Sequence, residues 1–289
     1  MYKCCACGKQ FQSGERLSDK ALWDEFLHEK RTYAELARMH RCSVSTIQRR
    51  IGGLDVEFHP KCPKHAVVVL DTTYFGRGFG VMVFQDALSG MILDRRYVRN
   101  ETNAEYLAGL EHLRQRGTEI LAVVCDGHKG LIQAIDYCPV QMCQFHMQQI
   151  VCRSLTKNPH LIAGRELLSL TKQMKSLGCA AFTGRFSDWC CRWDKFLNER
   201  TLLSSGKTTY THRRLRKARQ SIRSHLPWLF TYEDYPGLGI PNTTNLLEGT
   251  NSEMKRLLRN HNGLSGERRV KFIDGFLETW GSNPNKEEG

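Results

Sequence analysis

Two short apolar runs, each followed directly by an aspartate, constrain the fold of this 289-residue chain most strongly. Residues 66–70 and 120–125 are rich in β-branched side chains, which is typical of strands buried on both faces of a sheet. Asp71 follows the first run and Asp126 follows the second. If the strands are neighbours, both carboxylates lie at the edge where open α/β sheets bind ligands. The alternative is that each aspartate is a strand-end or turn residue.

The segments around these runs predict a mixed sheet with helices on its faces. The expected order is strand, strand, strand, helix, strand, helix, strand, over residues 65–70, 78–85, 90–98, 103–116, 120–125, 129–136 and 139–145. A helical crossover is needed to bring the fourth strand beside the first in a parallel pair. Asp86, in a turn, and Asp94, on a polar strand face, are expected to be structural.

A third acid strengthens the interpretation of a metal site. Two close carboxylates repel each other unless a cation neutralises them, and Mg²⁺ or Mn²⁺ prefers oxygen ligands. Residues 243–256 predict a helix on which Asn245, Glu248 and Asn251 share one face that leads on to Lys255. An acid between amides, followed by bases, suits a site for a metal and a phosphate. A solvated capping helix is the alternative, and Glu253 lies off this row.

Four motifs in order resemble the signature of Mutator-type bacterial insertion-sequence transposases. They are Asp71, Asp126-Gly-His-Lys-Gly130, Cys143-Gln-Phe-His146 and Thr244-Asn-Leu-Leu-Glu-Gly-Thr-Asn251. The resemblance covers residues 65–280, with a spacing of 55 residues from Asp71 to Asp126 and of 122 from Asp126 to Glu248. It implies an α/β, ribonuclease-H-like mixed sheet with a helical insertion. It also implies that Asp71, Asp126 and Glu248 are the catalytic triad of a DDE enzyme, with Cys143, His146, Asn245 and Asn251 as signature positions.

The same resemblance implies a cofactor and a reaction. Two Mg²⁺ or Mn²⁺ ions about 3.5–4 Å apart support an in-line phosphoryl displacement. Asp71 would bind both ions, and Asp126 and Glu248 one each. Water attack would nick the end of the element, and 3′-hydroxyl attack would join that end to target DNA. For Cys143 and His146, metal ligation, a structural role and phosphate contact all remain open.

Residues 22–51 have the pattern of a helix-turn-helix. The first helix, 32–40, would bury Tyr33, Leu36 and Ala37, and residues 41–43 would form the turn. In the recognition helix, 44–51, Val44, Ile47 and Ile51 would face the core. The side chains expected to reach base edges and phosphates in the major groove are Ser45, Thr46, Gln48, Arg49 and Arg50. A plain helical hairpin is the alternative.

The N-terminal cysteines resemble half of a zinc ribbon. Cys4 and Cys7 form one Cys-x-x-Cys knuckle, whereas a closed structural Zn²⁺ site needs four ligands. The partner knuckle would normally precede this one. Either the true start lies upstream, the copy is decayed, or His40, Cys42 and the segment 59–62 complete the site. An incomplete knuckle is the favoured interpretation.

The charge balance predicts a polyanionic partner. The chain has 42 Lys and Arg against 30 Asp and Glu, a formal net charge of +12. Such a surplus indicates nucleic-acid binding but says nothing about fold. Residues 211–223 predict a helix with Leu215, Ala218 and Ile222 on one side. Its basic residues Arg213, Arg214 and Arg216 would follow phosphates, a merely solvated face being the alternative.

These patterns define the expected organisation. The predicted parts are a zinc-ribbon-like knuckle (1–15), a helix-turn-helix domain (16–60), the first part of the core (65–150), a helical insertion (151–240), C-terminal catalytic helices (241–280) and a disordered tail (281–289). No apolar run is long enough for a membrane span, and no signal-peptide core is present, so a cytoplasmic, bacterial, nucleoid-associated protein with reduced cysteines is expected.

The predicted function is that of a transposase. It would bind terminal inverted repeats and target DNA, form a homo-oligomer in the synaptic complex, and cleave and join DNA. Two alternatives remain: a truncated or domesticated non-catalytic DNA-binding repressor, and a nuclease of the same fold that hydrolyses without joining.

Overall fold

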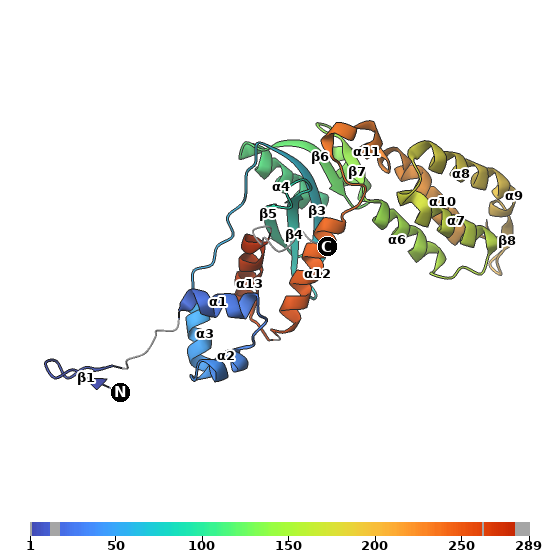
Figure 1. The fold of residues 1–289 in the computed structure, drawn as a ribbon. Coiled ribbons are helices and arrows are strands. Elements are labelled where there is room, and N and C mark those ends of the chain that lie inside the picture. Colours follow the sequence, from blue (N-terminus) through green and yellow to red (C-terminus); the bar gives the residue numbers. More distant parts are fainter. Residues whose placement is uncertain (1, 12–17, 262, 281–289) are drawn as a thin grey trace. The chain divides into compact units, whose positions relative to one another are not determined.

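The computed structural model describes residues 2–11, 18–261 and 263–280. These residues form two compact units, whose elements are labelled in Figure 1. Residues 59–251 make up the central unit, and residues 1–58 with 252–279 make up the terminal unit. The predicted disordered tail, 281–289, lies outside the described residues. No helix in the described ranges is long and apolar enough to cross a membrane.

The central unit is built on a five-stranded mixed sheet. Its strands are β3 (His65–Tyr74), β4 (Gly80–Asp86), β5 (Ile92–Val98), β6 (Glu119–Cys125) and β7 (Val140–Met142). The strand order is β5-β4-β3-β6-β7, so the first strand is central and the fourth lies beside it, as predicted. The pairs β3–β4 and β4–β5 are antiparallel, whereas β3–β6 and β6–β7 are parallel. The predicted mixed α/β sheet is therefore confirmed.

Helix α4 (Asn103–Gln115) makes the crossover from β5 to β6, and the short α5 (Lys129–Ala134) follows β6. Tyr106, Leu110 and Leu113 of α4 are buried in the main hydrophobic core. At Gly109 the helix approaches β4 so closely that a Cβ atom would lie 2.1 Å from Cζ of Phe84. This contact fixes the position of α4 on the sheet.

Asp86 and Asp94 are structural, as expected. Asp86 accepts a hydrogen bond from the backbone N–H of Val67 at 3.1 Å, and Asp94 contacts Nδ1 of His112 at 2.6 Å. Both carboxylates are buried and have partners, so neither is available to a ligand.

The insertion after β7 is mainly helical. Its helices are α6 (Gln144–Leu155), α7 (Ile162–Lys172), α8 (Cys179–Arg192), α9 (Asp194–Leu197), α10 (Arg213–His225) and α11 (Thr231–Asp234), with 3₁₀ turns at 173–175, 226–228 and 236–238. Phe186 and Trp189 are buried, and the indole N–H of Trp189 donates to the carbonyl of Ala163. These aromatic rings therefore belong to the core rather than to a base-stacking surface.

One part of the insertion differs from the purely helical expectation. Residues 200–210 form a hairpin of β8 (Arg200–Leu202) and β9 (Thr208–Tyr210), which turns through Gly206 at φ 76°. Leu202 is 69% exposed, so this hairpin lacks the buried face on which a strand pattern depends. The helical prediction for this short segment was wrong for that reason.

The terminal unit is helical apart from a short N-terminal hairpin of β1 (Tyr2–Lys3) and β2 (Gln10–Phe11). Its helices are α1 (Asp19–Leu27), α2 (Tyr33–Met39), α3 (Val44–Gly53) and α13 (Gly266–Thr279), together with the part of α12 (Asn245–Arg259) that follows residue 251. Thr32 and Glu35 form a reciprocal capping box at the start of α2. Phe26 of α1 packs edge-on against Phe272 of α13, with ring centroids 5.8 Å apart. The C-terminal helix thus contributes to the core that the N-terminal helices need.

The predicted inward faces of α2 and α3 are largely confirmed. Leu36 and Ala37 of α2 and Ile47 and Ile51 of α3 are buried. Val44 is 40% exposed, however, so its predicted core position was wrong. It is the first residue of α3, directly after the N-cap Ser43, and lies at the helix end.

Candidate active site

The strands β3 and β6 bring Asp71 and Asp126 to the same edge of the sheet. Val69 of β3 pairs with Val124 of β6, and continuing this register by two residues places Asp71 opposite Asp126. Strand β6 ends at Cys125, whereas β3 continues to Tyr74 along β4. The prediction that β3 ends at Asp71 was therefore wrong, because pairing with β4 extends it. Among the described strands, β3 has no partner on its β6 side after the Val69–Val124 pair, and the candidate site lies there.

Helix α12 contributes the third acid and an amide. Asn251 Nδ2 donates to Asp71 Oδ2 at 2.9 Å, which ties the start of α12 to the centre of β3. Glu248 lies one turn earlier and accepts from the hydroxyl of Thr244 at 3.0 Å. Asn245, the first residue of the predicted polar row, is exposed. The row of residues 245, 248 and 251 thus begins at the surface and ends at Asp71.

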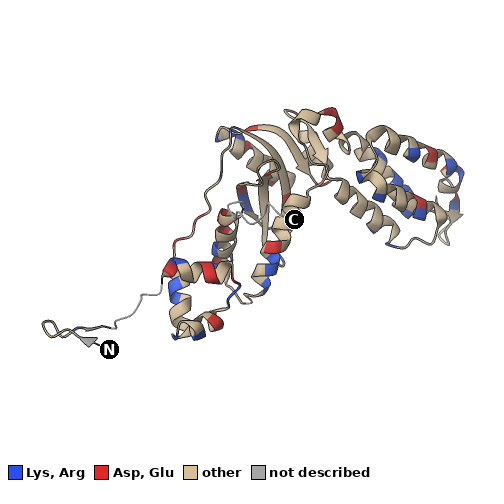
Figure 2. Cartoon of the chain, viewed as in Figure 1, with Lys and Arg blue, Asp and Glu red and all other residues tan. Residues whose placement is uncertain are grey.

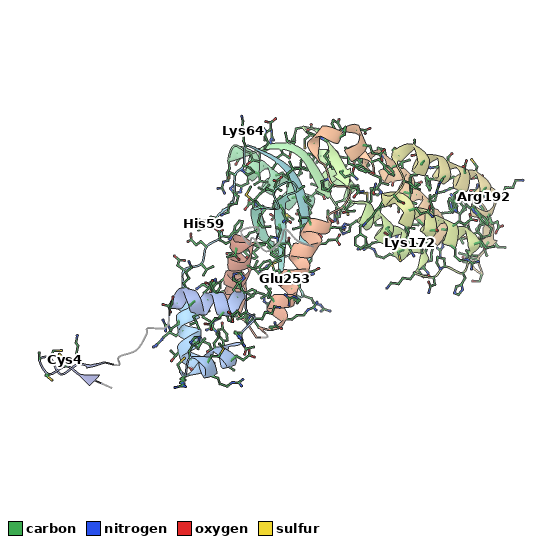
Figure 3. All side chains as sticks on the ribbon, viewed as in Figure 1. Cys4, His59, Lys64, Lys172, Arg192 and Glu253 are labelled. Atoms are coloured by element: carbon green, nitrogen blue, oxygen red, sulfur yellow. The ribbon has the colours of Figure 1, made fainter. Side chains whose placement is uncertain are left out.

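The competing acid Glu253 has a different environment. It lies on α12 beyond residue 251 and is labelled in Figure 3. Its carboxylate accepts from Nε of Arg256 at 2.6 Å, on the same helix. The geometry therefore favours Glu248 over Glu253 as the acid that joins the candidate site.

Cys143 and His146 lie beside Glu248. Cys143 is the N-cap of α6, is fully buried, and accepts from the backbone N–H and the hydroxyl of Thr244, both at 3.3 Å. Potential ligand atoms of Cys143, His146 and Glu248 all lie within 4.8 Å of one another. The Cys-x-x-His motif is thus joined to the third acid by Thr244, which contacts both.

Cys143 and His146 shift each other's pKa toward the charged forms. Burial acts to raise the pKa of Cys143, but hydrogen bonds from His146 and Thr244 outweigh it and lower that pKa. Burial acts to lower the pKa of His146, but the hydrogen bond to Cys143 and the negative charges of Cys143, Asp71 and Asp126 raise it to about 9. His146 therefore places positive charge among the acids.

Asp71 occupies an unfavourable position for a carboxylate. Burial is the main cause that raises its pKa to about 6, and the charges of Asp126 and Glu101 act in the same direction. The positive charge of His146 and the backbone N–H of Thr72 oppose this shift. A bound cation would relieve both the burial cost and the mutual repulsion.

The donor set fits a divalent cation. Carboxylate oxygens from Asp71, Asp126 and Glu248 are the ligand type that Mg²⁺ and Mn²⁺ prefer. Within the described residues, Oδ1 of Asp126 and Oδ1 of Asn251 are buried without a hydrogen-bond partner. Buried polar atoms normally have partners, so these two oxygens indicate a missing ligand.

Two residues near this centre were not identified from the sequence. Glu101 and His128 lie close to Asp126, and potential ligand atoms of the three residues are within 4.8 Å of one another. Glu101 directly precedes Thr102, the N-cap of α4. An acid at this position commonly does no more than interact favourably with the helix dipole. His128 is the N-cap of α5 and lies within the quoted Asp126–Gly130 motif, which was the only available signal.

The residues predicted to contact DNA lie on three helices. On α3, Ser45 and Arg49 are exposed, Thr46 and Gln48 are half-buried, and Arg50 Nε donates to Asp19 of α1 at 2.6 Å. Lys255 of α12 is half-buried. Arg50 therefore has a structural role within the terminal unit, whereas Arg49 remains open to solvent.

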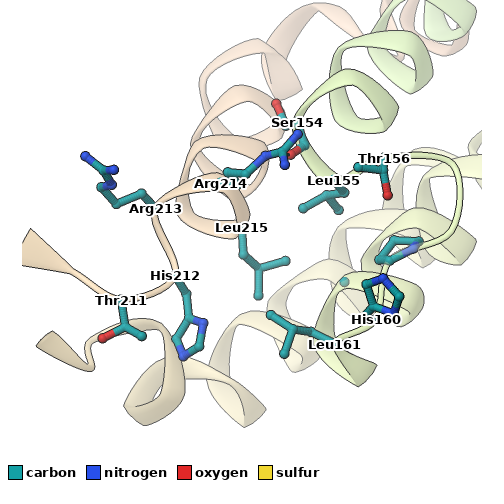
Figure 4. A pocket seen from close by; sticks show the side chains of 12 residues that line it. Ser154, Leu155, Thr156, His160, Leu161, Thr211, His212, Arg213, Arg214 and Leu215 are labelled. Carbon is teal, nitrogen blue, oxygen red and sulfur yellow. The ribbon is translucent and has the colours of Figure 1, made fainter. Parts of the chain in front are cut away.

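Basic residues gather along α10, where Lys and Arg are drawn in blue in Figure 2. Leu215, Ala218 and Ile222 form its buried face, as predicted. At its start, a cavity of about 400 Å³ lies between α10 and the α6–α7 connection (Figure 4). Arg214 Nε donates to the carbonyl of Ser154 at 2.8 Å, whereas Arg213 extends away from the cavity.

Arg216 also has partners within the insertion. It donates to the carbonyl of Leu197 at 3.0 Å, and its guanidinium lies 3.5 Å from the ring centroid of Tyr210. Of the three α10 arginines predicted to contact DNA, Arg213 is therefore the one most available to a phosphate.

The N-terminal knuckle is a tight turn between β1 and β2. Cys4 N–H donates to the carbonyl of Lys9 at 2.8 Å, and Gly8 adopts a left-handed φ of 69°. A backbone hydrogen bond from Cys7 is the main cause that lowers the pKa of Cys4. Among the described residues, no group of three potential metal ligands includes Cys4 or Cys7. Zinc binding at this knuckle stays a prediction.

The sequence of residues 88–175 matches the family model described as Transposase, Mutator family. The matched segment contains Asp126, Cys143 and His146 and lies between Asp71 and Glu248. The resemblance to Mutator-type transposases is thereby confirmed. Transposition and DNA recombination are the class of function that this match supports.

The chain also matches several solved structures, all at low identity and with TM-scores below 0.5. The catalytic core of HTLV-2 integrase with magnesium is 17% identical, over 52% of this chain and 95% of that chain, with a TM-score of 0.22. The Drosophila P element transposase strand transfer complex is 10% identical, over 98% and 95%, with a TM-score of 0.42. The Mos1 strand transfer complex is 11% identical, over 69% and 81%, with a TM-score of 0.19. No curated protein matches the sequence.

Proposed function

We propose that this protein is a DDE transposase with a ribonuclease-H-like core, which cleaves insertion-sequence ends and joins them to target DNA. The observation that carries the proposal is the hydrogen bond from Asn251 to Asp71. It brings the helix of the third acid to the strand of the first acid, although 180 residues separate the two partners. The strand order, with β3 central and β6 beside it, supports the assignment of the core.

Asp71, Asp126 and Glu248 are the residues that would hold two Mg²⁺ or Mn²⁺ ions. Such ions, when bound, activate an attacking hydroxyl and stabilise a leaving 3′-oxygen. Asn251 orients the carboxylate of Asp71, and Thr244 orients that of Glu248. The positive charge on His146 would attract the scissile phosphate to the carboxylates, and Cys143 supports that charge.

DNA binding is assigned to two other regions. Helices α2 and α3 would act as a helix-turn-helix that reads the terminal repeats, with α3 in the major groove. The basic face of α10 would follow the phosphates of the flanking DNA. The protein would act as a homo-oligomer in the synaptic complex and work on DNA in the bacterial cytoplasm.

The recognition helix is tested with Arg49→Ala. The exposed guanidinium is expected to contribute about 1–3 kcal/mol to binding of terminal-repeat duplexes. Fluorescence anisotropy at fixed salt, with a scrambled duplex for comparison, measures the loss. Ser18→Ala, which removes the N-cap of α1 on the same unit, serves as a control that leaves the proposed DNA contacts intact. Unchanged affinity in Arg49→Ala would move recognition away from α3.

The assignment of the third acid is tested with Glu248→Gln and the matched control Glu253→Gln. The duplexes carry any inverted repeats found in the DNA that flanks the gene. We expect Glu248→Gln to reduce Mg²⁺-dependent nicking and strand transfer more than about 100-fold. Substitution of a residue that only orients a metal ligand typically costs about 10–100-fold, so a larger loss indicates a ligand. End binding should stay intact, and Glu253→Gln should behave as wild type.

The outcomes separate the alternatives. Full activity of Glu248→Gln would exclude Glu248 as the third acid. A wild-type protein that binds ends but never nicks them would identify a repressor. Nicking without joining, with 3′-hydroxyl ends supplied, would identify a nuclease.

A further inference from the structure

Glu101 lies at the same edge of the sheet as the predicted acids, although it comes from a different element. Nε2 of His128 is 3.6 Å from Oε1 of Glu101 and 3.4 Å from Oδ2 of Asp126. Charge-assisted hydrogen bonds are usually 2.7–2.9 Å long, so these separations are too long for a tight ion pair. Adjacent ligand atoms around an octahedral divalent ion lie about 3 Å apart, and about 3.5 Å for the larger Ca²⁺. The spacing of the three side chains therefore resembles a ligand set.

The position of Glu101 is fixed by a chain of hydroxyl groups. The hydroxyl of Tyr106 donates to Oε1 of Glu101 at 2.5 Å and lies 2.8 Å from the hydroxyl of Thr72. Tyr106 is buried on α4, and Thr72 directly follows Asp71 on β3. This chain holds the carboxylate of Glu101 beside Asp126 and connects it to the backbone that carries Asp71. A solvent-exposed acid that only interacts with the start of a helix would need no such chain of hydroxyl groups.

An unpartnered oxygen of Asp126 points to a ligand at this centre, and a second unpartnered oxygen belongs to Asn251, which bonds to Asp71. Oδ1 of Asp126 is buried and, among the described residues, accepts no hydrogen bond. Asn251 is 5% exposed, and its Oδ1 also lacks a partner while its Nδ2 bonds to Asp71. Buried polar atoms normally have a hydrogen-bond partner, so the unpartnered oxygen of Asp126 favours a cation or its water ligand at this centre.

We propose that Glu101 is a fourth metal-binding carboxylate, which together with Asp126 and His128 binds one divalent cation. The set offers two carboxylates and one imidazole, a donor combination that divalent cations such as Mn²⁺ accept. The inference rests on the proposed function in taking Asp126 as a metal ligand, and it adds Glu101 and His128 to the three acids. It also gives the segment that leads into α4 a direct part in the site.

The test is Mn²⁺ binding to the metal-free full-length protein, measured by the electron paramagnetic resonance signal of free Mn²⁺. Glu101→Gln keeps the size of the side chain and its acceptor for Tyr106 but removes the charge. Glu105→Gln is the matched control, because Glu105 lies four residues later, in the first turn of α4, and pairs with Arg96 at 2.8 Å. Thermal unfolding in EDTA verifies that each variant is folded.

We expect Glu101→Gln to weaken the binding of one Mn²⁺ at least tenfold, and Glu105→Gln to bind as wild type. His128→Gln should weaken the same ion and provides a second variant at a surface position. Wild-type binding by both Glu101→Gln and His128→Gln would overturn the inference. If Asp126→Asn loses an ion in that case, the proposed function survives. A wild-type protein that binds no Mn²⁺ would overturn both proposals.

Discussion

At the scale of single residues, the candidate site gathers negative charge around the largely buried carboxylate of Asp71. Asp71 lies near Asp126 and Glu101, and its carboxylate accepts hydrogen bonds from the side chain of Asn251 and the backbone N–H of Thr72. Proteins commonly place carboxylates in such unfavourable surroundings at sites that bind a ligand or carry out catalysis. The electrostatic cost at Asp71 therefore gives a prediction that does not depend on activity.

Asp71→Asn should stabilise the metal-free protein. The folded-state pKa of Asp71 is raised from 3.8 to about 6, so the folded state binds the proton more tightly than the unfolded state. The unfolding free energy of the wild type should therefore fall as the pH rises from about 4 to about 6. Above this window the asparagine variant should be more stable by roughly 1–3 kcal/mol.

Urea unfolding in EDTA at pH 4.5 and pH 7.5 measures this difference. The gain should be small at pH 4.5 and full at pH 7.5, and added Mg²⁺ should narrow it by stabilising the wild type. A variant that is less stable than the wild type at pH 7.5 would contradict the burial argument.

The sequence could predict those site residues whose neighbours are set by regular structure. Asp71 and Asp126 end apolar runs, and parallel pairing of two such runs brings them together. Asn251 was found through its spacing from Glu248 on one helix face. Glu101 could not be found in this way, because its approach to Asp126 depends on how α4 lies across the sheet. No local pattern encodes that packing.

At the scale of elements, α4 and α12 determine which side chains meet at the site. Helix α4 starts beside Glu101 and is fixed to β4 by the contact between Gly109 and Phe84. Helix α12 is fixed to the sheet by Asn251 at Asp71 and by Thr250, whose hydroxyl donates to Gln85 of β4 at 3.3 Å. Small changes in either helix should therefore alter the site.

The matched pair Gly109→Ala and Gly249→Ala tests this packing. A Cβ at position 109 would overlap the ring of Phe84, so this variant should lose about 1–3 kcal/mol of unfolding free energy. Gly249 on α12 has no atom within 4 Å of an added Cβ, so alanine there should gain about 0.5–1 kcal/mol through helix propensity. Chemical denaturation measures both values. Equal effects of the two substitutions would contradict close packing at Gly109.

Elements with strong periodicity were predictable, and those without it were not. The order of five strands and two helices followed from apolar runs of 5–6 residues and one helical stripe. The hairpin β8–β9 has an exposed face and gave no such signal. The extension of β3 past Asp71 depends on β4, a partner that the strand's own residues do not specify.

At the scale of the whole molecule, the proposed catalytic acids and the proposed helix-turn-helix lie in two different units. The central unit contains all three proposed catalytic acids and the basic helix α10. The terminal unit contains the proposed helix-turn-helix and is completed by α13, whose Phe272 packs on Phe26. The net charge of +12 favours DNA, while the carboxylates at the site need cations.

The most direct test of the central claim is a metal-specificity switch at Asp71, measured as strand transfer of a 3′-hydroxyl terminal-repeat duplex into plasmid DNA. A thiolate ligand disfavours Mg²⁺ and accepts softer ions more readily. We expect Asp71→Cys to lose more than about 100-fold of activity in Mg²⁺ and to recover at least about tenfold in Mn²⁺, while the wild type uses both ions. Wild-type activity of Asp71→Cys in Mg²⁺ would contradict the assignment of Asp71 as a metal ligand and, with it, the proposed DDE centre.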